Sequence, residues 1–118
     1  MAMQHYSGSC QCGAVTFEAD LDLDRTVTCN CSRCRRLGSI LSFTPAPSFH
    51  LFSGEGATRE YLFNTGEIHH LFCTTCGIEP FARAIGPDGS EMVAVNARCL
   101  DGVDLKSLHP VEHDGASR

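Results

Sequence analysis

Eight cysteines in a chain of 118 residues limit what this protein can fold into more than any other feature of its sequence. A domain of this length buries an adequate but not a generous core, so cysteine-rich chains of this size often gain stability from disulfides or bound metal. Seven of the cysteines fall into close groups, which are Cys10 and Cys12, then Cys29, Cys31 and Cys34, then Cys73 and Cys76.

The cellular compartment expected for the chain indicates whether its clustered cysteines form disulfides or bind metal. The N-terminal stretch MAMQHYSGSC has no basic run followed by an apolar segment, and no apolar run approaches the roughly eighteen residues of a membrane helix. We therefore expect a cytoplasmic protein without membrane contacts, in which clustered thiols stay reduced and bind metal. A disulfide framework is the alternative, but Cys29, Cys31 and Cys34 are too crowded to reach separate partners without strain. The net charge of −5 argues against general nucleic-acid binding.

The pattern of apolar residues predicts a mainly β domain with very little helix. Residues 14–19 (AVTFEA) alternate as a half-buried strand does, and Pro87-Asp88-Gly89 predicts a hairpin turn. Further strands are expected within residues 39–45, 49–63 (two short strands), 68–72, 80–86 and 90–100. We expect a single domain, 1–118, with a core at about 8–108 and short polar termini. The last eighteen residues predict one short helical turn that frays into a polar end.

Two chelating turns predict a closed metal site. Cys10-Gln11-Cys12 is followed by Gly13, and Cys73-Thr74-Thr75-Cys76 is followed by Gly77. A turn that aims backbone N–H groups at thiolate sulfur often needs positive φ just after the second ligand, which glycine adopts freely. Together the turns supply the four thiolates of a structural zinc site, and zinc binding there would stabilise the fold directly.

The remaining group, Cys29, Cys31 and Cys34, offers three ligands where a closed site needs four. The fourth position can belong to water, to a substrate or to a distant residue. Candidates for the distant residue are Cys99, His50, His69, His70, His109 and His113. Cys99 can also be a buried small hydrophobe or a reactive thiol. Strand alternation predicts that at most one of His69 and His70 points toward a given site.

A zinc held by three thiolates carries net negative charge and is well suited to accept a fourth sulfur, which it deprotonates. Arg33, Arg35 and Arg36 stand beside the cluster and can offset that charge or hold a substrate carboxylate in forked hydrogen bonds. A solvated face that contacts nothing is the alternative for these arginines. The residues alone thus favour a small thiol that carries carboxylates.

Four segments in this order resemble the glutathione-dependent formaldehyde-activating enzyme family, also called the GFA or CENP-V/GFA domain: GSCQCGAVTFEA, CNCSRCRRLGS, LFCTTCGIEPFARA and VAVNARCLDGVD. The resemblance runs from about Gly8 to Leu108. It implies an Mss4-like fold of several small coiled antiparallel sheets stapled by two Zn2+ ions, with no other cofactor. It places Cys10, Cys12, Cys73 and Cys76 at the structural zinc, and Cys29, Cys31 and Cys34 at the catalytic zinc.

The resemblance also implies a reaction and leaves two alternatives. The founding activity of the family condenses glutathione with formaldehyde and is classed as a carbon–sulfur lyase, so we expect an enzyme that forms or cleaves an adduct between a small, glutathione-type thiol and an aldehyde. One alternative is an Mss4-like thiol redox enzyme that uses Cys99. The other is a non-catalytic zinc-binding module for protein interaction.

Overall fold

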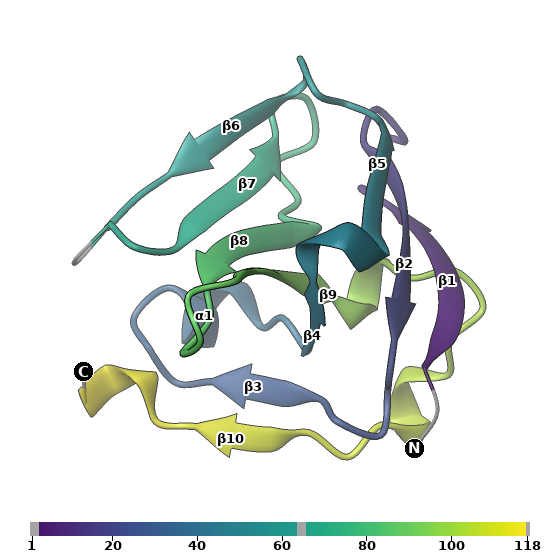
Figure 1. The fold of residues 1–118 in the computed structure, drawn as a ribbon. Coiled ribbons are helices and arrows are strands. Elements are labelled where there is room, and N and C mark those ends of the chain that lie inside the picture. The colour runs from purple at the N-terminus through teal and green to yellow at the C-terminus, as the bar shows by residue number, and fades with distance from the viewer. Residues whose placement is uncertain (1–2, 64–65, 118) are drawn as a thin grey trace.

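Two β-sheets pack around one apolar core in the computed structural model, which describes residues 3–63 and 66–117 (Figure 1). The expected domain span, 1–118, also includes residues 1–2, 64–65 and 118, which lie outside the described residues. The smaller sheet has the order β1-β2-β5. Its strands are β1 (Gln4–Ser9), β2 (Thr16–Leu21) and β5 (Phe49–Ser53).

The larger sheet has the order β10-β3-β4-β9-β8-β7-β6, and its strands pair antiparallel except for β10, which runs parallel to β3. These strands are β3 (Val27–Cys29), β4 (Leu41–Pro45), β6 (Thr58–Tyr61), β7 (His69–Cys73), β8 (Phe81–Ile85), β9 (Glu91–Asn96) and β10 (Val111–His113). The helical elements are short: α1 (Cys34–Leu37) and the 3-10 turns η1 (Ala46–Ser48), η2 (Ala97–Cys99), η3 (Leu105–Ser107) and η4 (Gly115–Ser117).

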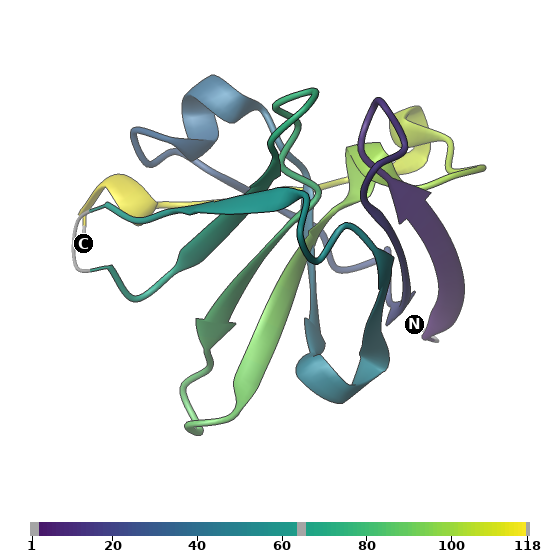
Figure 2. The same ribbon diagram turned by 90° about the horizontal axis from the view of Figure 1, so that it is seen from above.

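The core forms where the two sheets face each other (Figure 2). Alternation along β2 buries Phe17, Ala19 and Leu21. The ring of Phe17 stacks on that of Phe49 at 5.4 Å between centroids, and Phe49 meets Phe81 of the larger sheet at 4.7 Å. These aromatic contacts join the sheets, since Phe17 and Phe49 belong to one and Phe81 to the other.

The prediction of a mainly β protein is confirmed, and the architecture is consistent with a small Mss4-like fold. The expected hairpin is present between β8 and β9, where Gly89 has a φ of 85°. Strands β1 and β3 were not expected, because their sequences carry no clear apolar alternation. In the described residues, no helix is long and apolar enough to span a membrane.

The expectation for the C-terminal end is wrong in part. A helical turn does form at η3 (Leu105–Ser107), but the residues after it do not fray. They form β10, which lies beside β3 (Figure 1) and brings η4 next to the end of that strand. All three residues of β10 are exposed, so this strand is held by backbone hydrogen bonds and leaves no hydrophobic pattern in the sequence.

Candidate metal centres and the adjoining cavity

The first cysteine cluster joins two loops from different sheets. Cys10 and Cys12 lie between β1 and β2, Cys73 ends β7, and Cys76 lies between β7 and β8. Their four sulfurs all lie within 4.8 Å of one another, with Cys12 Sγ 3.7 Å from Cys10 Sγ and 3.6 Å from Cys73 Sγ. Tetrahedral zinc with Zn–S bonds of roughly 2.3 Å places its sulfurs about 3.8 Å apart. The donor set and its spacing therefore fit zinc.

Backbone N–H groups converge on these sulfurs. Val15 donates to Cys10 Sγ at 3.3 Å, and Thr75 donates to Cys73 Sγ at 3.4 Å. A hydrogen bond from the backbone N–H of Ile78 lowers the pKa of Cys76 to about 6, against the opposing effect of burial. Gly13 and Gly77 follow the turns with φ of 83° and 81°, as expected for such chelates. The N–H groups of the second turn thus favour the thiolate form of Cys73 and Cys76, the form in which cysteine binds metal.

The second cluster consists of Cys29 at the end of β3, Cys31 in the following turn and Cys34 at the start of α1. Their sulfurs also lie within 4.8 Å of one another. Within residues 3–63 and 66–117, no fourth cysteine, histidine or carboxylate ligand atom joins this group. Burial raises the pKa of Cys34, and the neighbouring Cys31 thiolate raises it further. Three crowded, partly buried thiolates without a cation would repel one another, so this set also suits a metal ion.

Cys99 lies beside the first cluster and not the second. Burial raises its pKa to about 11, and the negative charges of Cys10 and Cys76 contribute to this shift. Cys99 ends η2, is partly buried and packs against the core, so its interpretation as a buried small hydrophobe holds only in part. A thiol with so high a pKa is a poor nucleophile at neutral pH, which disfavours a redox role.

The histidines considered as a fourth ligand are dispersed. His69 Nδ1 lies 2.9 Å from Glu60 Oε1, within ion-pair distance, while His50 and His109 are exposed. His70 and His113 line a cavity that also contains the second cluster, but neither lies within the ligand group. The alternation along β7 therefore separates His69 from His70 as expected.

A buried polar chain runs from α1 to β7. Arg33 donates to Glu79 Oε1 through Nε at 3.1 Å and Nη2 at 2.6 Å, and His70 Nδ1–H donates to Glu79 Oε2 at 2.9 Å. His70 and Glu79 are each 4% exposed, and His70 Nε2 has no hydrogen-bond partner among the described residues. Glu79 was missed from the sequence. Its only signal is a lone carboxylate between Ile78 and Pro80, directly after the second chelating turn.

None of the three arginines beside the cysteine cluster lines the cavity. Arg36 donates to the carbonyl of Ser32 at 2.7 Å. Arg33 and Arg36 line a separate hollow of about 450 Å³ with Tyr61 and Phe63, and the Arg33 guanidinium lies 4.6 Å from the centre of the Tyr61 ring. A role of Arg33, Arg35 and Arg36 in binding a carboxylate stays a prediction.

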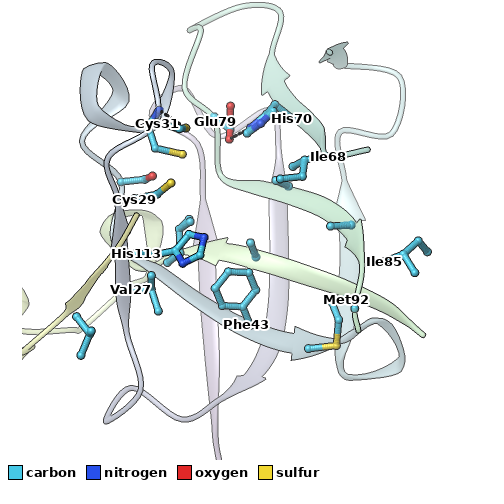
Figure 3. A pocket seen from close by; sticks show the side chains of 18 of the residues that line it. Val27, Cys29, Cys31, Phe43, Ile68, His70, Glu79, Ile85, Met92 and His113 are labelled. Carbon is cyan, nitrogen blue, oxygen red and sulfur yellow. Dashed lines mark hydrogen bonds and ion pairs between the residues drawn. The ribbon is translucent and has the colours of Figure 1, made fainter. Parts of the chain in front are cut away.

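The cavity beside the second cluster has a volume of about 710 Å³, the size of a small-molecule site. Cys29, Cys31, Glu79 and His70 lie toward one end of it (Figure 3). Phe43, Met92 and Ile85 lie toward the other end, and His113 lies between Cys29 and Phe43 (Figure 3). The three-cysteine cluster is therefore part of the wall of a small-molecule cavity.

The C-terminal segment covers the second cluster from one side. Asn30 Nδ2 donates to Asp114 Oδ1 at 3.1 Å, and the Ala116 N–H donates to Asn30 Oδ1 at 2.9 Å. Between them, Gly115 is buried, and a Cβ built on it would lie only 2.5 Å from Cys29 Sγ. Residues 114–116 are thus part of the site, which the sequence pattern did not predict.

Comparison with known proteins agrees with these observations. Residues 5–115 match the family described as "Glutathione-dependent formaldehyde-activating enzyme". The fold is also similar to the crystal structure of a Rhodobacter sphaeroides protein, with a TM-score of 0.79 and 32% sequence identity over 90% of this chain and 97% of that one.

The close approach of Gly115 to Cys29 leads to a first test. We expect Gly115→Ala to displace the Cys29 sulfur, because a Cβ cannot stay 2.5 Å from it, and so to remove metal from the second cluster alone. Elemental analysis of the purified protein should show about half the bound zinc of the wild type, with unchanged circular dichroism. The control is Gly56→Ala, whose added Cβ meets nothing within 4 Å. Equal zinc in both variants would contradict the covering role of the C-terminal segment.

Proposed function

The chain belongs to the glutathione-dependent formaldehyde-activating enzyme family, and from that premise we propose that it is a carbon–sulfur lyase-like enzyme that forms or cleaves an adduct between a small thiol and an aldehyde such as formaldehyde. The observation that carries the proposal is the three-cysteine cluster, which lies in the wall of a small-molecule cavity with no fourth ligand among the described residues. Catalytic zinc sites typically keep such an exchangeable position.

We assign the two clusters different tasks. Cys10, Cys12, Cys73 and Cys76 would hold a structural Zn2+, since their four neighbouring sulfurs match the ligand number of a tetrahedral site and come from the loops of both sheets. Cys29, Cys31 and Cys34 would hold a reactive Zn2+. When bound, that ion supplies an acceptor for a fourth sulfur and stabilises the sulfur as thiolate.

The buried histidine supplies a route for the proton that the thiol loses. Because Nδ1–H of His70 donates to Glu79, the neutral ring carries a free lone pair on Nε2, the atom without a hydrogen-bond partner. We assign His70 Nε2 the role of accepting the proton that the thiol loses. As the new carbon–sulfur bond forms and the carbonyl π bond breaks, the aldehyde oxygen takes this proton and becomes a hydroxyl. No electrons are exchanged with any further reactant.

Glu79 and Arg33 position the histidine. The two hydrogen bonds from Arg33 fix Glu79 Oε1, which leaves Oε2 aimed at His70 Nδ1. A carboxylate that accepts a hydrogen bond from one ring nitrogen of a histidine fixes the tautomer and orientation of the ring. In this proposal, Arg33 affects the reaction only through Glu79 and His70.

The proposal is tested with Cys29→Ser and Cys73→Ser. Cys29→Ser should keep the fold and one zinc but lower hemithioacetal formation to the uncatalysed rate, because it removes a ligand of the reactive site alone. The rate is measured by NMR exchange between free and thiol-bound formaldehyde. Cys73→Ser should instead lower the thermal unfolding midpoint strongly, since it opens the cluster that joins the sheets. A Cys29→Ser protein that still accelerates the exchange would refute the assignment of the reactive site.

The role of His70 is tested by His70→Asn, which retains a donor for Glu79 and deletes Nε2. We expect the exchange rate to fall about a hundredfold, within the range for loss of a general acid–base group, with zinc content unchanged. His69→Asn is the matched control, because His69 is partly exposed and bonded to Glu60 outside the cavity. An activity loss accompanied by loss of zinc would instead indicate a purely structural role for His70.

A further inference from the structure

Among the described elements, no other sheet packs on one face of the larger sheet, and most side chains on this face are apolar. Strand alternation sends one set of side chains into the core beside the smaller sheet and the other set into the cavity. On β9, for example, Val93 and Val95 are fully buried in the core, whereas Met92 and Ala94 line the cavity. The same two-residue spacing brings apolar side chains to the cavity from neighbouring strands, namely Leu41 and Phe43, and Ala82 and Ala84.

Charge is distributed unevenly around this cavity. Among the residues that the structure describes, no lysine or arginine lines it. Arg83 of β8 faces the opposite side of the sheet, where its guanidinium lies 5.5 Å from the ring centre of Phe49 and 5.3 Å from that of Phe81. The cavity carboxylates are Glu79, which is bonded to Arg33 and His70, and Glu112, which is exposed.

This environment is unfavourable for a thiol that carries carboxylates. A carboxylate moved from water into an apolar cavity loses solvation, and only a cation or several hydrogen-bond donors can compensate. The described cavity wall offers no lysine or arginine, and only His70 and His113 could carry a positive charge there, while Glu112 adds repulsion. Large apolar side chains, in contrast, stay partly open to solvent: Phe43 is 48% exposed and Ile85 66%. An apolar ligand would cover them and gain hydrophobic stabilisation.

We propose that the thiol substrate of this site is an uncharged one with a hydrocarbon body, whose sulfur meets the three-cysteine cluster while its body lies along the apolar face of the larger sheet. The inference rests on the proposed thiol–aldehyde chemistry and narrows its substrate class. The body belongs to the thiol because the open metal position and the apolar wall share one cavity, and thiolate is the ligand that a soft, cysteine-bound metal accepts. The reaction balances as before: one carbon–sulfur bond forms, and the thiol proton moves to the aldehyde oxygen.

The test compares hexanethiol with mercaptohexanoate, which has the same chain length and a terminal carboxylate, and with glutathione. Binding to zinc-loaded protein is measured by calorimetry, and turnover with formaldehyde by NMR exchange. We expect hexanethiol to bind at least about tenfold more tightly than either carboxylate-bearing thiol and to give the larger catalysed rate.

Two matched variants locate the preference. Phe43→Arg replaces an apolar side chain of the cavity wall by a cationic one. It should weaken hexanethiol binding about tenfold and strengthen the binding of mercaptohexanoate. Phe52→Arg is the control, because Phe52 is also exposed, at 64%, but lies on β5 outside the cavity. It should leave both affinities unchanged. Both variants should keep their full zinc content, which shows that they are folded and loaded.

The outcomes separate this inference from the proposed function. If glutathione or mercaptohexanoate binds more tightly than hexanethiol, or is turned over faster with formaldehyde than hexanethiol is, the inference is wrong and the thiol–aldehyde chemistry stands. If Phe43→Arg and Phe52→Arg behave alike, the cavity is not the binding site. If no thiol binds the zinc-loaded protein or is turned over with an aldehyde, the proposed function fails, and the inference fails with it.

Discussion

The four-cysteine cluster is the constraint on which the rest of the structure depends. It ties the loop between β1 and β2 to the loop between β7 and β8, and thereby connects the smaller sheet to the larger one. The aromatic contacts among Phe17, Phe49 and Phe81 bury the same junction. In so short a chain, a metal bound at this point would add its binding free energy to a core of limited size.

Strand β7 separates the four-cysteine cluster from the cavity that contains the three-cysteine cluster. Cys73 and His70 stand three positions apart on this strand, so alternation directs them to opposite faces of the sheet. Cys73 joins the four-cysteine cluster, whereas His70 enters the cavity beside Cys29, Cys31 and Cys34. One sheet thus supports the four-cysteine cluster on one face, and the three-cysteine cluster with the buried His70 on the other.

The sequence predicted the features that depend on local pattern. Spacing grouped the seven cysteines correctly, alternation found most of the strands, and alternation also separated His69 from His70. The features that it did not predict depend on contacts distant in the chain. Glu79 gains its importance from Arg33, forty-six positions earlier, and β10 is held by β3 through backbone groups that carry no residue signal. The buried Gly115 is likewise meaningful only once Cys29 lies beside it.

The central claim, one closed and one open cysteine site, is tested most directly by X-ray absorption at the zinc edge on the zinc-loaded protein. The account predicts two zinc ions per chain and an average between three and four sulfur neighbours per zinc, with a lighter atom completing the second site. Addition of hexanethiol should raise the average to four. An average of four sulfurs before any thiol is added would mean that the second site is already closed, and would contradict the account.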